Sequence, residues 1–479
     1  MTDAPVDFDL KTMQQVERCG YEPIQRKGRG SYGFVYEVGD AQGDLFAFKY
    51  ILPDQSYKIL GLDSLNEVDI LSRIHHPHIL HAANIITPHN CEIEGMAIVL
   101  PLADRTIYDI ITDPMMATEN KLPLLFKLAT ALDFMHRSHI LHLDIKSTNV
   151  VLQGNTPYFI DFGLSMVVDD ATLGKFERGT RVTIDHRAPE ILFGGRIYNA
   201  AVDVWAFGIM LLYILSGGPI FNVDFLKITP EEFYHVVVKM FTNPENTLNT
   251  LLKGVRPGYY NLSIDLLTKI LQIDPQRRLT AREICDHPIF DEFRQPIDGH
   301  LLSPPIRYDY ATDHRDILKL MIHWGRSLYS TSRAELLFLA VDLFNRMGSF
   351  YKDRDAIDRM SLSATCLWIA SKLTNSLLIP LDVYIPELAK MVPNINSDMI
   401  LNNEIEIIHS LSGILNVSPL YFASSNGDEL IMSFTHIILD KDSTLYARSN
   451  VPGWIQVMKG FIPNPIYKDK NINIAQLLS

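Results

Sequence analysis

Five short strings stand in a fixed order along the first part of the chain, and each supplies a different kind of group. They are GRGSYG at 28–33, a lysine at Lys49, a glutamate at Glu67, HLDIKSTN at 142–149 and DFG at 161–163. A glycine-rich turn, a paired cation and clustered oxygen ligands are the parts that position phosphates and neutralise their charge. Any one string has an ordinary structural explanation, but the ordered set predicts a site for ATP-dependent phosphotransfer.

Length and composition exclude several classes of protein. A chain of 479 residues is too long for one ordinary hydrophobic core and predicts two or more domains. Its formal net charge of -13 argues against direct binding of nucleic acid through general positive charge. The start, MTDAPVDFDL, lacks the positive and apolar regions of a signal peptide, and no apolar run is long enough to span a bilayer. We therefore expect a cytoplasmic or nuclear protein with no membrane partner.

The cysteines fit that compartment. Cys19, Cys91, Cys285 and Cys366 are scattered without the paired spacing of a zinc site or a disulfide framework. We interpret all four as core or surface thiols.

Hydrophobic patterning changes along the chain and suggests where the domains lie. Residues 21–50 are rich in β-branched and aromatic residues punctuated by glycine, which favours strands, and helical periodicity dominates afterwards. A proline-containing stretch follows 290, and beyond it apolar residues recur at helical spacing. These changes predict an N-terminal extension at 1–20, a mixed domain at 21–293, a linker at 294–312, an all-helical domain at 313–425 and a segment of unknown fold at 426–479.

The glycine-rich string is weak evidence when taken alone. Gly28, Gly30 and Gly33 fit a turn whose backbone N–H groups approach phosphate oxygens closely, because no Cβ stands in the way. The same spacing opens dinucleotide-binding folds, but a helix should follow there, whereas the strand-like FVYEV follows here. A phosphate loop between two strands is therefore the better interpretation.

Lys49 and Glu67 are the predicted cation and its partner. Lys49 lies in the strand-like FAFKY, where it can present an ammonium group to the α- and β-phosphates, and Glu67 can hold that group in place. By spacing, Glu67 shares one helix face with Leu71 and Ile74. An isolated glutamate would more often be a solvated charge on a helix. Because Lys49 and the glycine-rich string precede Glu67, the ion pair with Lys49 is the favoured interpretation here.

A predicted hairpin brings the oxygen ligands together. VVL at 150–152 and YFI at 158–160 are short apolar strands, and QGNTP between them is turn sequence. Antiparallel pairing would place Asn149 and Asp161 at one edge, as a pair suited to Mg²⁺. Asp144 can then orient a substrate hydroxyl and accept its proton, while Lys146 balances charge on the transferred phosphoryl group. The alternative is that Asp144, as an aspartate in a loop, only stabilises a turn or caps a helix.

Three further segments extend the pattern beyond this site: APE at 188–190, DVWAFG at 203–208, and Arg278 within DPQRR. With them, residues from about 21 to 290 resemble the catalytic domain of eukaryotic-type protein kinases. The resemblance implies an α+β bilobal fold with a β-rich N-lobe and a mainly helical C-lobe, ATP and Mg²⁺ as cofactors, and proteins bearing serine or threonine as substrates. Lys146 and Thr183 are similar to the serine/threonine branch.

The resemblance also implies roles for individual residues. Glu190 would pair with Arg278 in a structural contact, and Leu100 to Leu102 would form the hinge that contacts adenine. The implied catalytic residues are Asp144, Lys146, Lys49 and Glu67, and the implied metal ligands are Asn149 and Asp161. The implied nucleotide contacts are Gly28, Gly30, Ser31, Gly33, Val35, Ala47, Lys49, Leu100 and Leu102.

Details of the later segments are similar to cyclin-dependent kinases, with two departures. Val182 and Arg187 resemble the pair that shapes a pocket for proline after the phosphoacceptor, although Arg181 stands where that subfamily usually has valine. Leu143 replaces the usual arginine that clamps an activation-loop phosphate, and Arg178 occupies the usual phosphothreonine position. We therefore expect activity without activating phosphorylation there. The alternative is that Leu143 marks an impaired enzyme.

The helical segments from about 313 to 419 resemble a cyclin box, an all-α bundle of about five helices. Lys372 and Glu404 fall at the lysine and glutamate that lie on the kinase-facing surface of cyclins. A generic helical bundle is the alternative. A kinase followed by a cyclin box resembles fusions found in large DNA viruses and implies an internal activator, docked in cis or domain-swapped. LGLDSLNE at 60–67 differs from the usual cyclin-contacting helix, which favours dedicated internal pairing.

Three functions remain open from these observations. The first is a serine/threonine protein kinase switched on by its own cyclin-like domain and acting on cell-cycle or transcription proteins. The second is a non-catalytic scaffold whose cyclin box captures a separate cellular kinase, although Lys49, Asp144, Asn149 and Asp161 are all present. The third is a metabolite kinase, which the segments that position polypeptide substrates disfavour.

Overall fold

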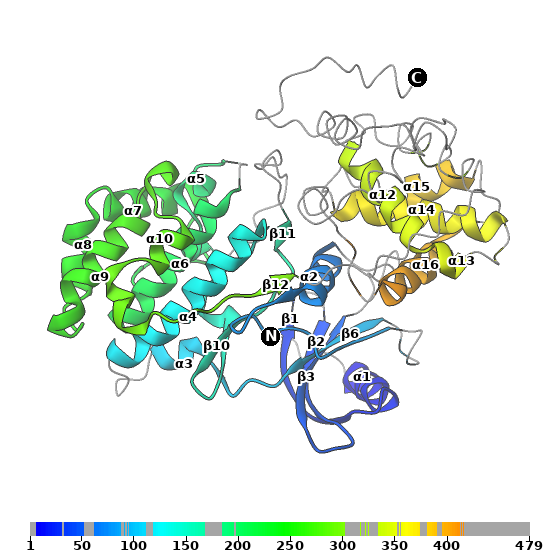
Figure 1. Cartoon of the computed structure of the whole chain (residues 1–479), viewed down its shortest axis with the longest axis horizontal. Helices are drawn as coiled ribbons and strands as arrows, with labels where there is room; N and C mark the ends of the chain where they lie inside the picture. Colours follow the sequence, from blue (N-terminus) through cyan, green and yellow to red (C-terminus); the bar gives the residue numbers. More distant parts are fainter. Residues whose placement is uncertain are drawn as a thin grey trace, which may run out of the picture.

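The computed structural model places a mixed sheet-and-helix body before a helical C-terminal bundle (Figure 1). It describes residues 6–30, 33–51, 62–87, 91, 93, 95–111, 118–167, 184–195 and 198–301. In the C-terminal part it describes 317, 321, 324, 334–351, 354, 356–373, 381–389, 395–411, 413 and 415.

A five-stranded antiparallel sheet forms the first layer. Its order is β1-β2-β3-β6-β5, and the strands span Glu22–Gly30 (β1), Gly33–Gly39 (β2), Leu45–Ile51 (β3), Met96–Pro101 (β6) and Asn84–Ile86 (β5). Val35 pairs with Lys49 across β2 and β3, and Ala47 pairs with Leu100 across β3 and β6. Because side chains alternate along a strand, these residues share one face of the sheet. The strands predicted for 21–50 are confirmed.

The opposite face of the sheet is covered by the N-terminal helix α1, Val6–Arg18. Val16 of α1 packs in a separate core cluster with Tyr36, Phe48 and Tyr50. The hydroxyl of Tyr50 donates a hydrogen bond to Gln15. The N-terminal extension therefore completes the core of this lobe, a role that its sequence did not indicate.

A disulfide between Cys19 and Cys91 fastens the end of α1 to the segment before β6. The interpretation of all four cysteines as thiols is therefore wrong for this pair. The two residues are separated by 72 positions, so no local spacing marked them as partners. Cys285 and Cys366 are buried thiols, as expected.

The helix α2, Leu62–Arg73, lies against the face of the sheet that carries Lys49. Glu67 and Leu71 are both buried on this helix, but Ile74 belongs to the short strand β4, Ile74–His75. The predicted helix face therefore ends at Leu71, because the helix ends at Arg73 and the chain becomes extended at 74.

The second lobe is mainly helical and is built around α4, Thr118–Arg137, and the almost wholly buried α6, Ala200–Ser216. Its other α-helices are α3 (Ile107–Ile111), α5 (Pro189–Leu192), α7 (Pro230–Phe241), α8 (Pro244–Leu251), α9 (Pro257–Ile270) and α10 (Ala281–Cys285). Short 3-10 turns span Ser147–Asn149, Ile184–His186, Pro275–Arg277 and Pro288–Phe293. A bilobal fold of this kind is the one predicted.

Short strands line the junction between the lobes. The strands β9, Val150–Gln153, and β10, Thr156–Phe159, pair antiparallel, as predicted for the hairpin, and β7, Arg105–Thr106, adds to β9. The strands β8, Ile140–Leu141, and β11, Met166–Val167, form a second pair.

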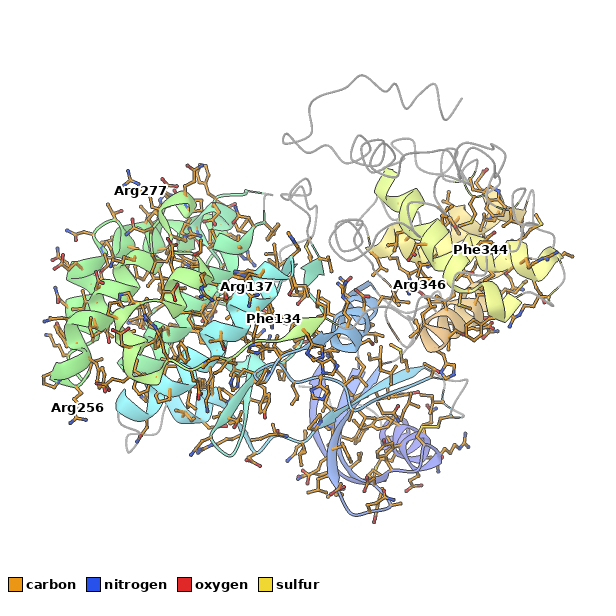
Figure 2. The ribbon with its side chains drawn as sticks, viewed as in Figure 1. Phe134, Arg137, Arg256, Arg277, Phe344 and Arg346 are labelled. Atoms are coloured by element: carbon orange, nitrogen blue, oxygen red, sulfur yellow. A yellow bond between two sulfur atoms is a disulfide. The ribbon has the colours of Figure 1, made fainter. Side chains whose placement is uncertain are left out.

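The C-terminal bundle is helical wherever it is described. Its helices are α12 (Ala334–Arg346), α13 (Gly348–Tyr351), α14 (Ala356–Leu373), α15 (Leu381–Ala389) and α16 (Ser397–Ser410). Arg346 and Asp342 form a buried ion pair within α12. Arg346 is labelled in Figure 2. Helix α14 packs against both α12 and α16, and it also contacts α2 of the first lobe. Within the described residues, no helix combines the length and apolarity needed to cross a membrane.

The first residues of the predicted linker are packed on the second lobe. The strand β12, His300–Leu301, pairs antiparallel with β4, and Asp298 accepts a 2.8 Å hydrogen bond from Arg137. Arg137 also lies over the ring of Phe134 on α4 (Figure 2). The chain is thus held beside α2 before it leaves for the bundle.

Two histidines after β4 are buried against this lobe. The ring of His76 stacks on Phe134 with centroids 5.3 Å apart, and Nδ1 of His78 donates to the carbonyl of Pro157 at 3.1 Å. Burial lowers the pKa of His76 to about 3 and that of His78 to about 4. Both imidazoles are therefore neutral in the folded protein at neutral pH.

These lowered pKa values predict acid sensitivity. In the unfolded chain these two histidines take up protons near pH 6.5, whereas in the folded protein they do so only when the pH falls to about 4 or lower. The free energy of unfolding should therefore fall as pH is lowered below 6.5, by about 1.4 kcal/mol per pH unit for each histidine. Denaturant unfolding at pH 7.5, 6.0 and 5.0 measures this loss. His76→Phe should flatten the decline, whereas the control His235→Gln, at an exposed position on α7, should not. An unchanged decline in His76→Phe would contradict this assignment.

Candidate active site

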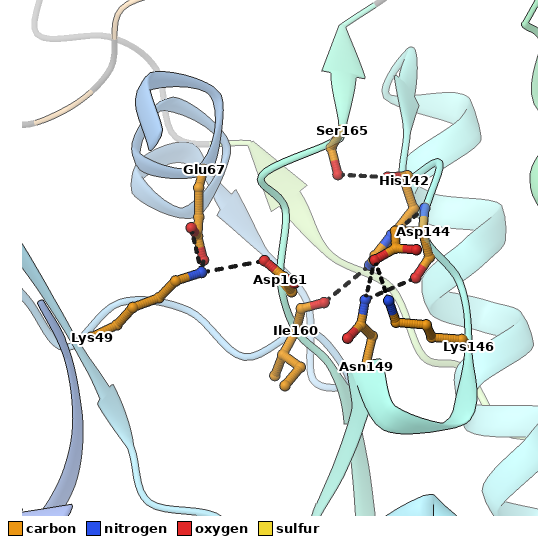
Figure 3. Close-up of polar contacts among 9 residues, drawn as sticks. All are labelled: Lys49, Glu67, His142, Asp144, Lys146, Asn149, Ile160, Asp161 and Ser165. Carbon is orange, nitrogen blue, oxygen red and sulfur yellow. Dashed lines mark hydrogen bonds and ion pairs between the residues drawn. The ribbon is translucent and has the colours of Figure 1, made fainter. Parts of the chain in front are cut away.

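A buried ion pair joins the sheet to α2. Nζ of Lys49, on β3, lies 2.7 Å from both carboxylate oxygens of Glu67, on α2. The same ammonium group lies 3.2 Å from Oδ1 of Asp161 (Figure 3). Burial by itself lowers the pKa of Lys49, but the charges of Glu67 and Asp161 outweigh that effect and raise it to about 12. Lys49 is therefore a permanent cation held between Glu67 and Asp161.

Asp161 follows the hairpin and is the more accessible carboxylate of this group. Its side chain is 44% exposed, whereas that of Glu67 is 2% exposed. Burial opposes ionisation of Asp161, but Lys49, His142 and Lys146 lower its pKa below the usual value. Its backbone has φ of 65°, a left-handed conformation that aspartate adopts more readily than most residues. The carboxylate is thus ionised and open to a ligand.

The second half of the site centres on Asp144. Nζ of Lys146 and Nδ2 of Asn149 each donate to Oδ2 of Asp144 at 2.8 Å (Figure 3). Asn149 also donates from Nδ2 to the carbonyl of Asp144 at 2.9 Å. Pairing of β9 with β10 lets the carbonyl of Asn149 accept from the N–H of Ile160, which directly precedes Asp161. The fold therefore brings together residues from four of the five strings, those of Lys49, Glu67, 142–149 and 161–163.

A buried carboxylate from another helix holds the loop that carries Asp144. Asp203, near the start of α6, accepts 2.8 Å hydrogen bonds from the backbone N–H groups of His142 and Leu143. Nε2 of His136 lies 3.2 Å from the same carboxylate. Leu143 has φ of 63°, a conformation that strains a branched side chain. Sequence reasoning assigned Asp203 only to a helix motif and missed that it stabilises this backbone.

His142 links that loop to the segment around Asp161. Its Nδ1 accepts from the N–H of Asp144 at 3.3 Å, so its Nε2 carries the proton and donates to the carbonyl of Ile160 at 3.2 Å. Its ring lies 4.9 Å from that of Phe162, and its carbonyl accepts from the hydroxyl of Ser165 at 3.0 Å. The catalytic loop and the DFG segment are therefore one connected unit.

Comparison with known proteins agrees with this geometry. The family model described as protein kinase domain matches residues 21–290, more than half of the chain. This chain belongs to the protein kinase family. Its catalytic domain is that of a serine/threonine protein kinase, as its relatives indicate.

Those relatives are kinases of two named groups. Over 301 residues the chain is 29% identical to cyclin-dependent kinase G-1 of Oryza sativa subsp. indica, covering 58% of this chain and 43% of that protein. It is 28% identical over 296 residues to mitogen-activated protein kinase 4 of Oryza sativa subsp. japonica, covering 58% of this chain and 80% of that protein. The chain is 27% identical over 311 residues to mitogen-activated protein kinase 6 of Arabidopsis thaliana, covering 60% of this chain and 77% of that protein.

Among the predicted nucleotide contacts of the kinase, Val35, Ala47, Lys49 and Leu100 share one face of the sheet. Gly28 and Gly30 are in β1 and Gly33 begins β2, while Ser31 lies outside the described residues. A Cβ on Gly33 would clash with the carbonyl oxygen of Tyr50. Glycine is therefore required there because β3 passes so closely, a reason separate from access to phosphates.

The predicted hinge of the kinase joins the two lobes. Leu100 is in β6, and Leu102 follows the end of that strand at Pro101. The carbonyl of Leu102 accepts a 2.9 Å hydrogen bond from the side chain of Gln153, on β9. The hinge backbone is thus tied to the same hairpin that carries Asn149.

The segment after the activation loop is anchored by a bidentate ion pair. The guanidinium of Arg278 lies 2.8 and 2.7 Å from the two carboxylate oxygens of Glu190, on α5, and over the ring of Trp205. Arg187 is buried just before α5, and burial lowers its pKa. Val182 and Thr183, the other residues predicted to contact substrate, lie outside the described residues, as do Arg178 and Arg181.

Lys372 and Glu404 form an ion pair in the C-terminal bundle. It joins the last turn of α14 to α16, and both side chains are almost fully buried. Burial lowers the pKa of Lys372 despite the nearby carboxylate. The pair therefore ties together the two bundle helices nearest α2.

The role of Asp203 is testable in the full-length kinase. Asp203→Asn replaces one accepting oxygen with an N–H donor that faces a backbone N–H, so the catalytic loop loses a charge-assisted contact. We expect kcat to fall about tenfold to a hundredfold with little change in the KM for ATP, since Lys49 and Glu67 are untouched. Steady-state kinetics measure kcat and the KM for ATP separately. Asp265→Asn, which alters the contacts of α9 with Lys269 and His287 and leaves the catalytic loop untouched, is the control. Equal kcat values in the two variants would contradict the role.

Proposed function

We propose that this kinase uses Mg²⁺ and ATP to phosphorylate serine or threonine in proteins, and that its C-terminal bundle is a cyclin-like internal activator. One observation carries the proposal: α2, which bears Glu67, is buried on both sides. Leu65, Val68, Asp69 and Leu71 are all under 4% exposed, although the helix is rich in polar residues. A surface helix would keep its polar stripe in water.

The donor set at the hairpin fits magnesium. Asn149 and Asp161 offer amide and carboxylate oxygens, the hard ligands that Mg²⁺ takes alongside phosphates and water. Among the described residues, no group of three or more His, Cys, Asp or Glu is arranged to hold a metal by itself. When bound, Mg²⁺ would neutralise charge on the phosphates.

The remaining residues have separable tasks in this proposal. Lys49, held by Glu67, binds the α- and β-phosphates. Asp144, oriented by Lys146 and Asn149, accepts the proton of the attacking hydroxyl, while the ammonium of Lys146 faces the transferred phosphoryl group. Each role follows from the chemistry of the group and from its position in the cleft.

The contact between α14 and α2 supports activation from within the chain. Kinase activity requires the lysine–glutamate pair, so a domain that fixes α2 controls whether Glu67 reaches Lys49. The ion pair of Lys372 and Glu404, at the end of α14, joins the two positions that the resemblance assigns to the lysine and glutamate of a cyclin box. Covalent linkage makes docking unimolecular, with an effective concentration on the order of millimolar for a flexible linker.

The environment of Leu143 supports independence from an activating phosphate. Its side chain is buried in the main hydrophobic core, where the related kinases carry an arginine for the phosphate. An apolar group cannot make a charge-assisted hydrogen bond. A preference for proline after the phosphoacceptor, from Val182 and Arg187, is a further part of the proposal.

A three-protein assay tests activity and dependence on the bundle together. Full-length wild type, Asp161→Asn and Lys372→Ala are compared on a generic serine/threonine protein substrate with Mg²⁺ and ATP. Asp161→Asn should be inactive. Lys372→Ala leaves Glu404 buried without its partner, which is typically destabilising by about 3–5 kcal/mol, so the bundle should unfold and activity should fall with it.

The control replaces both partners, Lys372→Met with Glu404→Leu, which keeps the volume and removes the charges. It should retain the bundle and the activity. Hydrogen exchange reports separately on α14 and on α6. Inert wild type would favour the scaffold function, and an active Lys372→Ala with an unfolded bundle would exclude internal activation.

Phosphatase treatment tests the regulatory part. Because Leu143 and Arg178 replace both partners of the usual switch, treatment should change kcat by less than about twofold, a difference under about 0.5 kcal/mol. The sites to examine are Thr172 and Thr180, which lie outside the described residues. Loss of activity on treatment, reproduced by alanine at either threonine, would contradict this prediction. A phosphatase-inhibited sample is the control.

A further inference from the structure

The two carboxylates of α2 point in different directions. Glu67 and Asp69 are two positions apart, which corresponds to about 200° around a helix. Glu67 meets Lys49 across the cleft, whereas Oδ1 of Asp69 accepts a 2.8 Å hydrogen bond from the backbone N–H of Leu415, just beyond α16. One helix is thus held from opposite sides by the sheet and by the bundle.

The charge of Asp69 is balanced locally. Nη2 of Arg73, one turn along α2, lies 3.2 Å from Oδ2 of Asp69, and both side chains are buried. Oδ1 is the oxygen that meets Leu415. Its donor is a main-chain N–H, so the contact depends on the path of the chain after α16 rather than on the side chain at 415.

Gly413 sets that path. It has φ of 77°, and its N–H donates to the carbonyl of Ile408 at 2.7 Å, closing the end of α16. A Cβ at this position would lie 3.0 Å from Cγ1 of Val68 and 3.1 Å from Cδ1 of Ile85. It would also meet Oγ of Ser72. A side chain at 413 would therefore be strained by the positive φ and would push against the side chains of Ser72, Val68 and Ile85.

The same face of α2 carries all of these contacts. Val68 and Ser72 are one turn apart, and Asp69 is adjacent to them, so they share the side of the helix away from Lys49. Leu411 and Leu415, on either side of Gly413, are each at most 1% exposed. The turn after α16 is therefore packed into α2 through apolar contact and one charge-assisted hydrogen bond.

We propose that Asp69 is a positioning residue for phosphotransfer: by capturing the Leu415 N–H, it fixes the rotation of α2 at which Glu67 faces Lys49. The inference rests on the proposed function, and it names the contact through which the bundle acts. Asp69 touches neither nucleotide nor substrate. Its effect reaches the cleft through α2, because turning the helix away from Leu415 also turns Glu67 away from Lys49.

The test uses full-length proteins. Asp69→Ala removes the acceptor, and Gly413→Ala obstructs the turn from the side of the bundle, with the sequence of the kinase domain unchanged. Each should lower kcat by about tenfold, the effect of losing one hydrogen bond to a charged group. Asp69→Asn keeps an accepting oxygen and should restore most of the activity. Because both changes remove one contact, the double variant should be no slower than the slower single variant.

A matched control carries the same backbone strain elsewhere. Gly43 lies between β2 and β3 with φ of 86°, and a Cβ there would meet nothing within 4 Å. Gly43→Ala should leave kcat unchanged. Hydrogen exchange of peptides covering α2 and Leu415 should rise in Asp69→Ala and Gly413→Ala but not in this control. Thermal unfolding of each variant separates loss of positioning from loss of folded protein.

The outcomes distinguish the two proposals. If Gly413→Ala exposes the Leu415 amide yet keeps full kcat, the inference is wrong, even where Lys372→Ala shows that the bundle is needed. The inference is also wrong if the loss of kcat in the double variant equals the product of the two single losses, since Asp69 and Gly413 would then act independently. If wild type itself is inactive, the proposed function fails and the inference falls with it. Where Asp69→Ala does not fold, Gly413→Ala decides the question.

Discussion

The ion pair between Lys49 and Glu67 is the contact on which the rest of the site depends. It joins β3 to α2, and Asp161 approaches the same ammonium group from the second lobe. Removing three charges from water is unfavourable unless they compensate one another, so the pair forms only where packing brings the three segments together. The arrangement of the lobes therefore decides whether the phosphate-binding cation is in place.

Helix α2 is the element that carries this constraint to the remainder of the chain. Its polar residues would suit a solvent-exposed helix, yet Asn66, Glu67 and Asp69 are all buried. The reason is that the sheet and cleft occupy one side, while α14 and the turn after α16 occupy the other. A buried polar group needs a partner, and on this helix the identified partners come from two different parts of the fold.

Contacts within one strand, turn or hairpin were predictable from sequence. The hairpin of β9 and β10 was expected because alternation and turn residues act over a few positions, and it brings Asn149 close to the residue before Asp161. The two-lobe fold followed from motif order. By contrast, the cover that α1 provides for the sheet, the Cys19–Cys91 disulfide and the support that Asp203 gives to Leu143 were missed. Each joins segments that are distant in sequence, such as Gln15 and Tyr50, which are 35 positions apart, and spacing cannot pair them.

The sequence by itself determined the chemical groups of the kinase site and the order in which they occur, because those properties belong to residue types and short motifs. Tertiary structure decided the contacts that no motif marks. Asp69 could have been a solvated charge on α2, and its contact with the N–H of Leu415 was set by packing of the bundle against that helix. Glycine at 413 is a further case, since its φ of 77° disfavours a side chain locally, but only the fold places it against Val68 and Ile85.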